Sequence, residues 1–409
     1  MWEKFKKSAT HLDSVHYEIR GPLLIEANRL ESLGNKILKL NIGNPAIFGF
    51  EVPEVFKDTL QNSLYQYHGY CDSKGHLDAR KAIIEYNHKL GVGLDINDPN
   101  RVYIGNGVSE LILLVTNALC DHGDEILVPA PDYPLWSAAV NLAGAKAVYY
   151  RCDPDNKWQP DLADIESKIT DKTKAIVIIN PNNPTGQVYS KEVLQGLVDL
   201  AIKHELIVLS DEIYDRITYD QAQHVPIASL SDKALVITFN GASKANRLCG
   251  YRLGWMFLTG PFDQAPGFVA SLDKLTSMRL CSVSPFQAII RECLEKDLSI
   301  YDLTAPGGRL YEQRTLLVNR INQIDGLSCE NVHGALYAFV KIDLDRFNFV
   351  DDLDFAKKLL SEEHTLVIHG QGFNWKDKNH FRIVFLPDVE QLSLALDAIE
   401  RLCQRYRKN

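Results

Sequence analysis

Residues 234–252 read ALVITFNGASKANRLCGYR, an apolar run followed by a turn of small residues and a lysine. The run Leu235–Phe239 has the Val and Ile content of a buried strand, and Gly241–Ser243 ends it. Lysine is ordinarily a solvated surface residue, so Lys244 is unusual in following a buried strand. We expect it to be desolvated among cationic neighbours, with the lowered pKa that condensation with a carbonyl group requires.

Two residues close to Lys244 suit an anion. Ser243 offers a hydroxyl, and Arg252 offers a planar fork of donors that matches phosphate oxygens. Their spacing is Ser243-Lys244-x5-Gly250-x-Arg252. Taken alone, this segment fits an ordinary basic turn after a strand equally well, so other segments must decide between the two interpretations.

Further short apolar runs alternate with amphipathic helical stretches on both sides of this segment. They occupy residues 101–104, 125–128, 146–150, 174–179 and 206–209. This pattern is typical of an α/β fold whose mainly parallel sheet is covered on both faces. Polar and glycine-rich residues follow directly after the strands, at the carboxyl ends where ligands of open α/β sheets bind.

The C-terminal part of the chain has a different pattern. Helices are expected at 308–324 and 352–360, and strands at 335–341, 364–368 and 380–385. Because 409 residues exceed what one core usually supports, we predict a large α/β domain at 47–300 and a smaller α+β domain at 301–409. Residues 1–46 are expected to form an N-terminal arm and part of the small domain.

The composition excludes several classes of protein. Hydrophobic residues make up 45% and charged residues 24%, with a formal net charge of -9, so nucleic acid is not an expected partner. The chain start has no apolar core of signal-peptide length, and no run of about 18 apolar residues occurs, so neither secretion nor membrane insertion is expected. The eight cysteines form no C-x-x-C, so we expect free thiols in a reducing cytoplasm and no metal site.

Three polar residues follow two of the expected strands. Asp211 could pair its carboxylate with a protonated ring nitrogen of a ligand, or could cap a helix. Tyr214 offers either a hydroxyl donor or a half-buried ring. Asn183 offers an amide donor within Asn180-Pro181-Asn182-Asn183-Pro184-Thr185-Gly186, a segment that turn chemistry also explains residue by residue.

A phosphate site is indicated at Gly105-Asn106-Gly107-Val108-Ser109-Glu110, where a strand leads into a helix. The free N–H groups of a helix N-terminus favour an anion, although ordinary capping explains such a turn as well. The segment matches neither G-x-x-x-x-G-K-[ST] nor G-x-G-x-x-G, which argues against ATPases and dinucleotide-binding enzymes.

Together these segments resemble the class I and II aminotransferases, enzymes of fold type I that use pyridoxal 5'-phosphate (PLP). The similarity follows the family's order through Asn41-Ile42-Gly43-Asn44-Pro45, Tyr70-x4-Gly75, Gly107-Val108-Ser109, Asn183-Pro184-Thr185-Gly186, Asp211-x-x-Tyr214, Ser243-Lys244-x5-Gly250-x-Arg252, Gly334-Ala335-x-Tyr337 and His380-Phe381-Arg382-Ile383. Segments 17–22, 130–136 and 306–314 further resemble the bacterial alanine (glutamate–pyruvate) aminotransferase subgroup.

The resemblance implies roles on the cofactor side. Lys244 would hold PLP as a Schiff base and then move the Cα proton of the substrate. Asp211 would keep the pyridine nitrogen protonated. The ring oxygen would accept hydrogen bonds from Asn183 and Tyr214, and Tyr133 would stack on the ring or simply pack as an aromatic. The phosphate would bind Val108, Ser109, Ser243 and Arg252, joined by Tyr70 of the neighbouring subunit in a homodimer with shared active sites.

The resemblance also implies a substrate side. Arg382 would fork onto the α-carboxylate, with Gly43, Asn183 and Tyr17 beside the substrate. Arg20, near Tyr17, is the candidate for the distal carboxylate of glutamate, although a surface or dimer-contact role fits equally. The implied reaction is ping-pong transfer of an amino group between an L-amino acid and a 2-oxo acid, with alanine and 2-oxoglutarate giving pyruvate and glutamate.

One departure and several alternatives remain open. Ala245-Asn246-Arg247 lacks the aromatic that the family usually carries near position 246, a departure that bears on the shape of the site wall, and Arg247 could join the positive pocket or lie at the surface. An aspartate or aromatic aminotransferase, or a C–S lyase on the same scaffold, would share these motifs. A PLP-binding transcription factor would need a DNA-binding module before residue 17, and an inactive scaffold would not need the complete set of matched residues.

Overall fold

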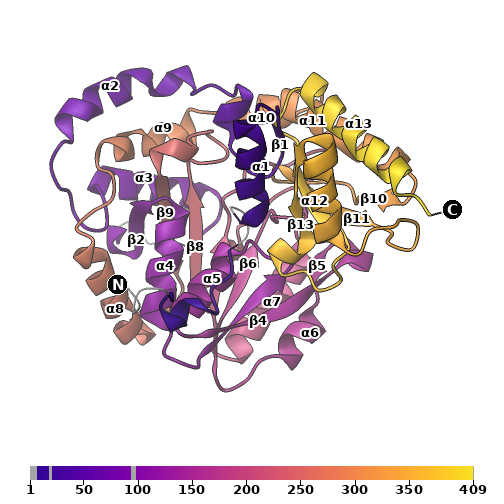
Figure 1. Cartoon of the computed structure of the whole chain (residues 1–409). Helices are drawn as coiled ribbons and strands as arrows, with labels where there is room; N and C mark the ends of the chain where they lie inside the picture. The colour runs from indigo at the N-terminus through magenta and orange to yellow at the C-terminus, as the bar shows by residue number, and fades with distance from the viewer. Residues whose placement is uncertain (1–6, 18–20, 94–97, 409) are drawn as a thin grey trace, which may run out of the picture.

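The computed structural model describes residues 7–17, 21–93 and 98–408, and an eight-stranded sheet forms its centre (Figure 1). In spatial order the strands are β2 (Val102–Asn106), β9 (Leu253–Thr259), β8 (Val236–Gly241), β7 (Ile207–Asp211), β6 (Thr173–Ile179), β3 (Glu125–Ala130), β4 (Lys146–Asp153) and β5 (Gln159–Pro160). The pairs from β8 to β4 are parallel, whereas β9 is antiparallel to both of its neighbours and β5 is antiparallel to β4. The expected mainly parallel sheet is confirmed.

Helices cover both faces of this sheet because successive strand residues point into two different cores. Tyr103 packs into the core on one face, and its neighbour Ile104 packs into the core on the other. The first core is closed by α4 (Val108–Leu119), α5 (Leu135–Leu142) and α8 (Pro266–Met278). The second is closed by α3 (Leu77–Lys89), α6 (Leu162–Ser167), α7 (Lys191–Lys203) and α9 (Ile290–Glu295).

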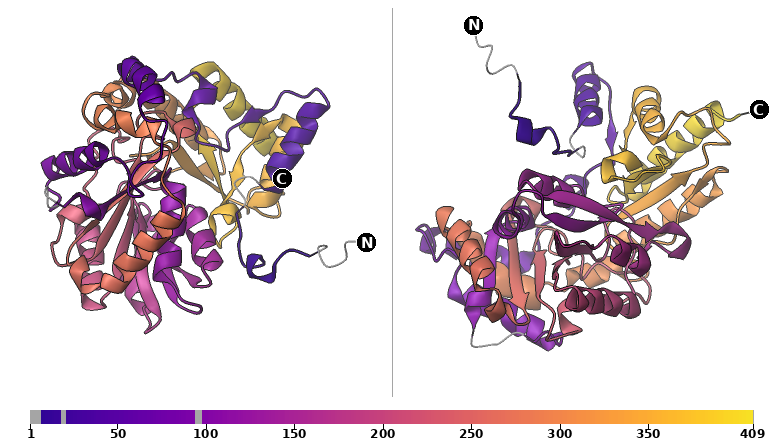
Figure 2. Two further views of the ribbon diagram at one scale, coloured as in Figure 1. Left: turned by 90° about the vertical axis from the view of Figure 1, so that its left-hand side faces the viewer. Right: turned by 90° about the horizontal axis from the view of Figure 1, so that it is seen from below.

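A second, smaller layer lies beside the large sheet (Figure 2). Its antiparallel sheet has the order β10 (Leu327–Ser328), β11 (Tyr337–Ile342), β14 (His380–Val384) and β13 (Ile368–His369). One core joins this sheet to α11 (Arg309–Gln323), α12 (Asp352–Glu363) and α13 (Val389–Arg405). The expected α+β character of the C-terminal part is therefore confirmed.

The N-terminal helix α1 (Pro22–Ser32) lies next to the C-terminal layer, far away along the chain (Figure 1). Ala27 and Leu30 share a small core with Leu360 and Leu366, and β1 (Leu38–Lys39) pairs in parallel with β12 (Thr365–Leu366).

The domain limits at residues 46 and 300 remain a prediction. The remaining α-helices are α2 (Lys57–Gln66) and α10 (Ser299–Thr304). Within the described residues, no helix has both the length and the apolar character needed to cross a membrane.

Several loops converge at one edge of the large sheet. Because β2, β3, β6, β7 and β8 run in the same direction, their carboxyl ends meet there. The antiparallel β9 begins at the same edge, which brings Arg252, the residue before β9, beside the loop after β8. Ligands of open α/β sheets bind at such an edge.

Candidate active site

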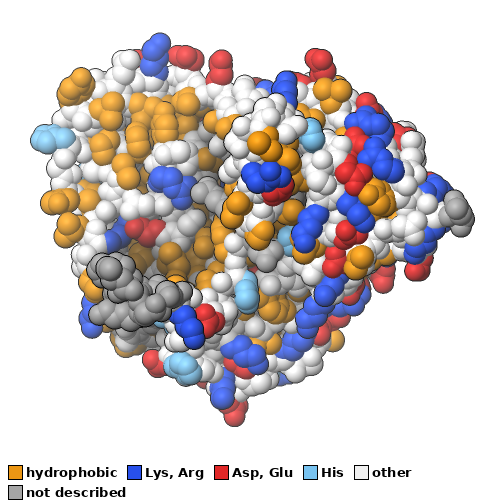
Figure 3. Space-filling model, viewed as in Figure 1, with side chains coloured by type: hydrophobic (Ala, Val, Ile, Leu, Met, Phe, Trp, Pro, Cys, Tyr) orange, Lys and Arg blue, Asp and Glu red, His pale blue; other side chains and the backbone are white. Residues whose placement is uncertain are grey.

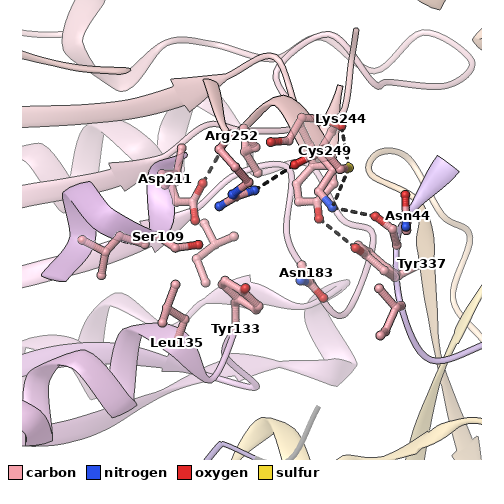
Figure 4. A pocket seen from close by; sticks show the side chains of 18 of the residues that line it. Asn44, Ser109, Tyr133, Leu135, Asn183, Asp211, Lys244, Cys249, Arg252 and Tyr337 are labelled. Atoms are coloured by element: carbon pink, nitrogen blue, oxygen red, sulfur yellow. Dashed lines mark hydrogen bonds between the residues drawn. The ribbon is translucent and has the colours of Figure 1, made fainter. Parts of the chain in front are cut away.

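A cavity of about 540 Å³ opens at this edge, and residues of both sheets line it (Figure 4). Its volume falls within the range of small-molecule sites. Most of the predicted site residues line the cavity, namely Tyr17, Gly43, Val108, Ser109, Tyr133, Asn183, Asp211, Tyr214, Ser243, Lys244, Arg252 and Arg382. Tyr70 does not line it and is 84% exposed, while Arg20 lies outside the described residues.

Lys244 enters the cavity from the loop after β8. Its Nζ donates a hydrogen bond to the carbonyl oxygen of Gly43 at 2.6 Å and lies 3.9 Å from Sγ of Cys249. Burial lowers the pKa of Lys244, but the Tyr337 and Cys249 side chains raise it, and the net direction is upward. The expected lowered pKa is thus wrong for the chain by itself, because burial and the neighbouring arginines together do not outweigh these two side chains.

Asp211 ends β7 and is buried at the base of the cavity. Its Oδ2 accepts a hydrogen bond from Nε1 of Trp136 at 3.2 Å, and its Oδ1 accepts one from the backbone of Ile213 at 3.3 Å. No helix follows Asp211, so the alternative role as a helix cap is not found. Burial raises the pKa of Asp211 to about 6, against the opposing effect of the Trp136 hydrogen bond.

The N-terminus of α4 forms an anion-binding end of the cavity together with Arg252. Val108 and Ser109 supply first-turn N–H groups, which have no partners within a helix. Gly107 precedes them with φ 78°, a backbone conformation that favours glycine, and a Cβ there would lie 2.3 Å from Nη2 of Arg252 and displace it. Arg252 is held by the carbonyl oxygens of Cys249 and Asn106 at 3.0 and 3.3 Å.

Arg382 of β14 lies on the opposite side of the cavity and is 2% exposed. Its Nη1 donates to Oδ1 of Asn183 at 2.9 Å, and its Nη2 donates to the carbonyl oxygen of Asn41. Among the described residues, no carboxylate forms an ion pair with this guanidinium. Because a buried charge without a counterion is costly, Arg382 is suited to receive an anionic ligand.

Four tyrosines also line the cavity. Tyr214 and Tyr337 have their hydroxyl oxygens 2.9 Å apart, and those of Tyr17 and Tyr133 are 3.5 Å apart. The sequence alone assigned no role to Tyr337, Asn44 or Cys249, although all three line the cavity. Tyr337 and Asn44 belong to motifs that carry the family resemblance, and their place in those motifs was the signal that could have assigned them to the site.

The departure at Asn246 and Arg247 lies away from the cavity. Asn246 accepts a hydrogen bond from Nη2 of Arg216 and donates to Oδ2 of Asp297, both at 2.8 Å. Arg247 is buried, donates to Oγ of Ser299 at 2.6 Å and lies 3.5 Å from Asp297. Both expectations for Arg247, a place in the positive pocket and a surface position, are therefore wrong.

The whole sequence is similar to proteins of one known family. The profile described as aminotransferase class I and II matches residues 35–399. The chain belongs to this family. It is 53% identical to the glutamate-pyruvate aminotransferase AlaA of Haemophilus influenzae, covering 97% of this chain and 98% of that protein. It is 49% identical to the alanine aminotransferase of Mycobacterium tuberculosis, covering 99% and 94% of the two chains.

Solved structures give the same assignment. An aminotransferase from Escherichia coli superposes with a TM-score of 0.96 at 50% identity, covering 98% of this chain and 99% of the other. The alanine aminotransferase of Pyrococcus furiosus superposes with a TM-score of 0.91 at 36% identity, covering 98% and 100%. The chain therefore has the fold type I architecture of a PLP-dependent aminotransferase.

The side chains of the cavity fit PLP at each of its chemical groups. Lys244 supplies an amine for the aldehyde, and the buried carboxylate of Asp211 suits the pyridine nitrogen. The N-terminus of α4 and Arg252 suit the phosphate, where the absent Cβ of Gly107 leaves room for the arginine. The donor set thus matches an aldehyde, a basic ring and a phosphate in one cavity.

Proposed function

We propose that this enzyme transfers an amino group between alanine and 2-oxoglutarate, giving pyruvate and glutamate by a ping-pong mechanism. The observation that carries the proposal is that Lys244, Asp211 and Arg382 meet in one cavity. The names of the relatives from Haemophilus influenzae and Mycobacterium tuberculosis support the choice of alanine and glutamate.

On the cofactor side, each residue has a separate task. Asp211 would pair with the pyridine nitrogen. Because Oδ1 of Asn183 already accepts from Arg382, the Asn183 side chain would offer its N–H₂ group to the ring oxygen, beside the hydroxyl of Tyr214. Tyr133 would cover one ring face. The phosphate would be bound by Val108, Ser109, Ser243 and Arg252. Bound PLP supplies an electron-accepting ring that stabilises the negative charge left at Cα when its proton is removed.

Lys244 would carry the proton in both half-reactions. Its Nζ would take the proton from the substrate's Cα, so the amine must be unprotonated and well oriented at that moment. The carbonyl oxygen of Gly43, which lines the cavity, accepts a hydrogen bond from this Nζ at 2.6 Å and so limits the directions in which the amine can point. Gly43 would therefore serve Lys244 through its carbonyl oxygen.

Arg382 would bind the α-carboxylate that amino and oxo substrates share. A guanidinium donates two parallel hydrogen bonds to a carboxylate, which fixes the Cα of the substrate in direction as well as position. Arg382 now donates to the Asn183 and Asn41 oxygens, so an incoming carboxylate would find a guanidinium that is already oriented. This orientation is independent of the substrate side chain.

The distal carboxylate of glutamate needs a second cation, and we propose Arg20 for it. Tyr17, three residues earlier, lines the cavity and contacts Tyr133. Arg20→Ala is expected to weaken glutamate and 2-oxoglutarate much more than alanine and pyruvate, as judged by kcat/KM for each substrate. Equal losses for both pairs would remove Arg20 from the substrate site.

We also propose a homodimer with shared active sites. Hydrophobic side chains gather over α2 and α9 at the upper left of Figure 3. Leu64 and Tyr65 of α2 are 54% and 86% exposed, Tyr70 is 84% exposed and Met278 of α8 is 73% exposed. Apolar surface of this extent favours burial against a second copy, from which Tyr70 would reach the phosphate of its neighbour.

Mixing two inactive variants tests the shared site. Lys244→Ala and Tyr70→Ala subunits, each inactive or weak alone, should regain activity when unfolded and refolded together, because one of the two sites in a mixed dimer is then intact. Unchanged activity after mixing, with mixed dimers demonstrated by a tag on one subunit, would contradict sharing.

We also propose that the enzyme lies in the cytoplasm, where its thiols would remain reduced.

A substrate panel tests the activity itself. The purified protein should show a visible absorbance band of bound cofactor that alanine and glutamate convert to the amine form and that pyruvate and 2-oxoglutarate restore. Aspartate or aromatic amino acids acting better than alanine would favour the alternative aminotransferases. Release of pyruvate and ammonia from a cysteine conjugate without any oxo acid would identify a C–S lyase.

A further inference from the structure

Tyr337, the first residue of β11, contacts the substrate side and the cofactor side of the cavity at once. It is 2% exposed and lines the cavity (Figure 4). Its position is fixed by the sheet, where it pairs with Val384 of β14. A Cβ on Gly43 would lie 2.0 Å from the Tyr337 hydroxyl oxygen, so the absence of a side chain at Gly43 gives that hydroxyl its place.

The ring of Tyr337 binds the guanidinium of Arg382. The guanidinium carbon lies 4.2 Å from the ring centroid of Tyr337 and 4.7 Å from that of Phe373, so two aromatic rings contact the same cation. Such contacts strengthen when water is excluded, and this arginine is buried. The two rings thus limit the directions in which Arg382 can offer its donors.

The hydroxyl of Tyr337 binds the hydroxyl of Tyr214. Their oxygens are 2.9 Å apart, and the rings meet edge to face with centroids 5.8 Å apart. A hydroxyl has one proton to donate. If Tyr214 donates its proton to the cofactor ring oxygen, the hydrogen bond between the two tyrosines must be donated by Tyr337.

We propose that Tyr337 is a positioning residue that acts through two neighbours, with its ring orienting Arg382 and its hydroxyl donating to Tyr214. The inference rests on the proposed function, because it assigns Arg382 to the substrate carboxylate and Tyr214 to the cofactor ring oxygen. Donation by Tyr337 polarises the Tyr214 hydroxyl and strengthens the hydrogen bond that Tyr214 donates onward. One side chain would then adjust substrate binding and cofactor electronics by separate parts of its structure.

Two substitutions separate the two parts. Tyr337→Phe keeps the ring and removes the hydroxyl, whereas Tyr337→Leu removes both. The first readout is the pH at which the visible band of the bound cofactor titrates, measured without substrate. The second is the Kd of glutarate, which carries carboxylates but neither an amino nor an oxo group. Neither readout requires turnover, so both can be measured even if the enzyme prefers a substrate other than alanine.

Tyr337→Phe should raise the spectral titration point by about half a pH unit or more, because a weaker hydrogen bond leaves more electron density on the ring oxygen to hold a nearby proton. Its glutarate Kd should stay within about twofold of the wild-type value, since the cation–π contact is retained. Tyr337→Leu should show the same upward shift and, in addition, a rise of about tenfold in the glutarate Kd.

Phe373→Leu is the matched control for the ring. It removes the second ring at Arg382 without touching Tyr214, so it should raise the glutarate Kd and leave the spectral titration point unchanged. If Tyr337→Leu does not fold, Tyr337→Met takes its place, as a flexible side chain of similar volume without a ring.

Each arm of the proposal has its own contrary result. A spectral titration point in Tyr337→Phe that does not move, or moves downward, would overturn the role of the hydroxyl. Wild-type affinity for glutarate in the ring-deleted variant would overturn the role of the ring. Failure of the wild-type protein to transfer amino groups would instead refute the proposed function. The spectral titration and the glutarate Kd do not test that function.

Discussion

The side-chain oxygen of Asn183 accepts a hydrogen bond from Nη1 of Arg382 at 2.9 Å, and this contact joins the two sheets across the cavity. Asn183 follows β6 of the large sheet, and Arg382 lies in β14 of the small one. A residue assigned to the cofactor and a residue assigned to the substrate therefore fix each other's orientation. Relative movement of the two layers would change both ends of the site together.

Replacing Arg382 by lysine should lower kcat/KM for alanine and for glutamate alike by about 100-fold or more, because an ammonium cannot fork onto a carboxylate. It also cannot keep donors on both Asn183 and Asn41 while lying between two rings. The measurement is steady-state kinetics with both amino acids, after cofactor content has been matched by absorbance.

A matched control is Arg314→Lys, at a buried arginine of α11 that pairs with Asp220 at 2.9 Å and does not line the cavity. It should keep the kinetic constants of the wild-type enzyme while losing some thermal stability. A loss at Arg382 confined to one of the two amino acids would contradict its assignment to the shared α-carboxylate.

Lys244→Ala should fold normally and fail to transfer amino groups. In the described chain its Nζ contacts only the Gly43 carbonyl and, weakly, Cys249, so truncation removes little that supports the fold. The loss in kcat should be about 1000-fold or more, since proton transfer and covalent attachment of the cofactor both depend on this amine. Circular dichroism and the melting temperature report the fold, and a coupled assay reports activity.

Lys244→Arg is the comparison variant, because it keeps a positive charge at the same place but cannot condense with an aldehyde. It should be as inactive as Lys244→Ala. Activity above about one per cent in either variant would mean that another group moves the Cα proton.

Asp211→Asn should separate stability from activity. The folded chain without cofactor binds the Asp211 proton more tightly than an unfolded chain does, because burial raises the pKa to about 6. Ionisation of this carboxyl therefore destabilises the fold as the pH rises from about 4 to above 6. The asparagine variant lacks this penalty, so without cofactor it should melt higher than the wild-type protein at about pH 8 and similarly at about pH 4.

The same substitution should nearly abolish transamination, since an amide cannot hold the pyridine nitrogen in its charged form. Melting curves of both proteins without cofactor at the two pH values, and activity of both with cofactor, complete the test. Asp132, another buried acid, is present in both proteins, so its titration cancels in the difference. A lower melting temperature for the variant at the higher pH would contradict the assigned penalty.

Much of the fold could be predicted because its signals are local. The run at 174–179 became β6 (Thr173–Ile179) and the run at 206–209 became β7, since a strand buried on both faces must be continuously apolar. The expectation did not include β9, although Leu253–Thr259 is equally apolar. Its antiparallel direction depends on pairing with β2 and β8. Because β2 lies about 150 residues away along the chain, no local sequence pattern could reveal this pairing.

Prediction of the site had a similar limit. Residues at strand ends, such as Asp211 and Lys244, were found because the sheet brings those ends together. Contacts between side chains could not be predicted from the sequence. The raised pKa of Lys244 was missed for this reason, since Tyr337, which raises it, comes from a different sheet. The partners of Asn246 were also hidden, because Arg216 and Asp297 lie 30 and 51 residues away from it.

The network around Asn246 leads to a prediction about stability. Asn246 is completely buried and bonds to Arg216, to Asp297 and, at 3.0 Å, to the carbonyl oxygen of Cys293. Asn246→Ala leaves a buried carboxylate and a buried guanidinium each short of a partner, which should cost about 2–4 kcal/mol in the free energy of unfolding. The melting temperature should fall by several degrees, while KM for alanine and glutamate should not change, because Asn246 does not line the cavity.

Asn87→Ala is the control for this experiment. Asn87 is also a buried asparagine, but among the described residues its side chain donates a single hydrogen bond, to the carbonyl oxygen of Ile83 within α3 at 2.8 Å. Its loss should lower the melting temperature less than the loss of Asn246, because no charged group is left unpaired. If Asn246→Ala instead changed KM and left the melting temperature unaltered, the residue would belong to the wall of the substrate site and not to a structural network with Arg216 and Asp297.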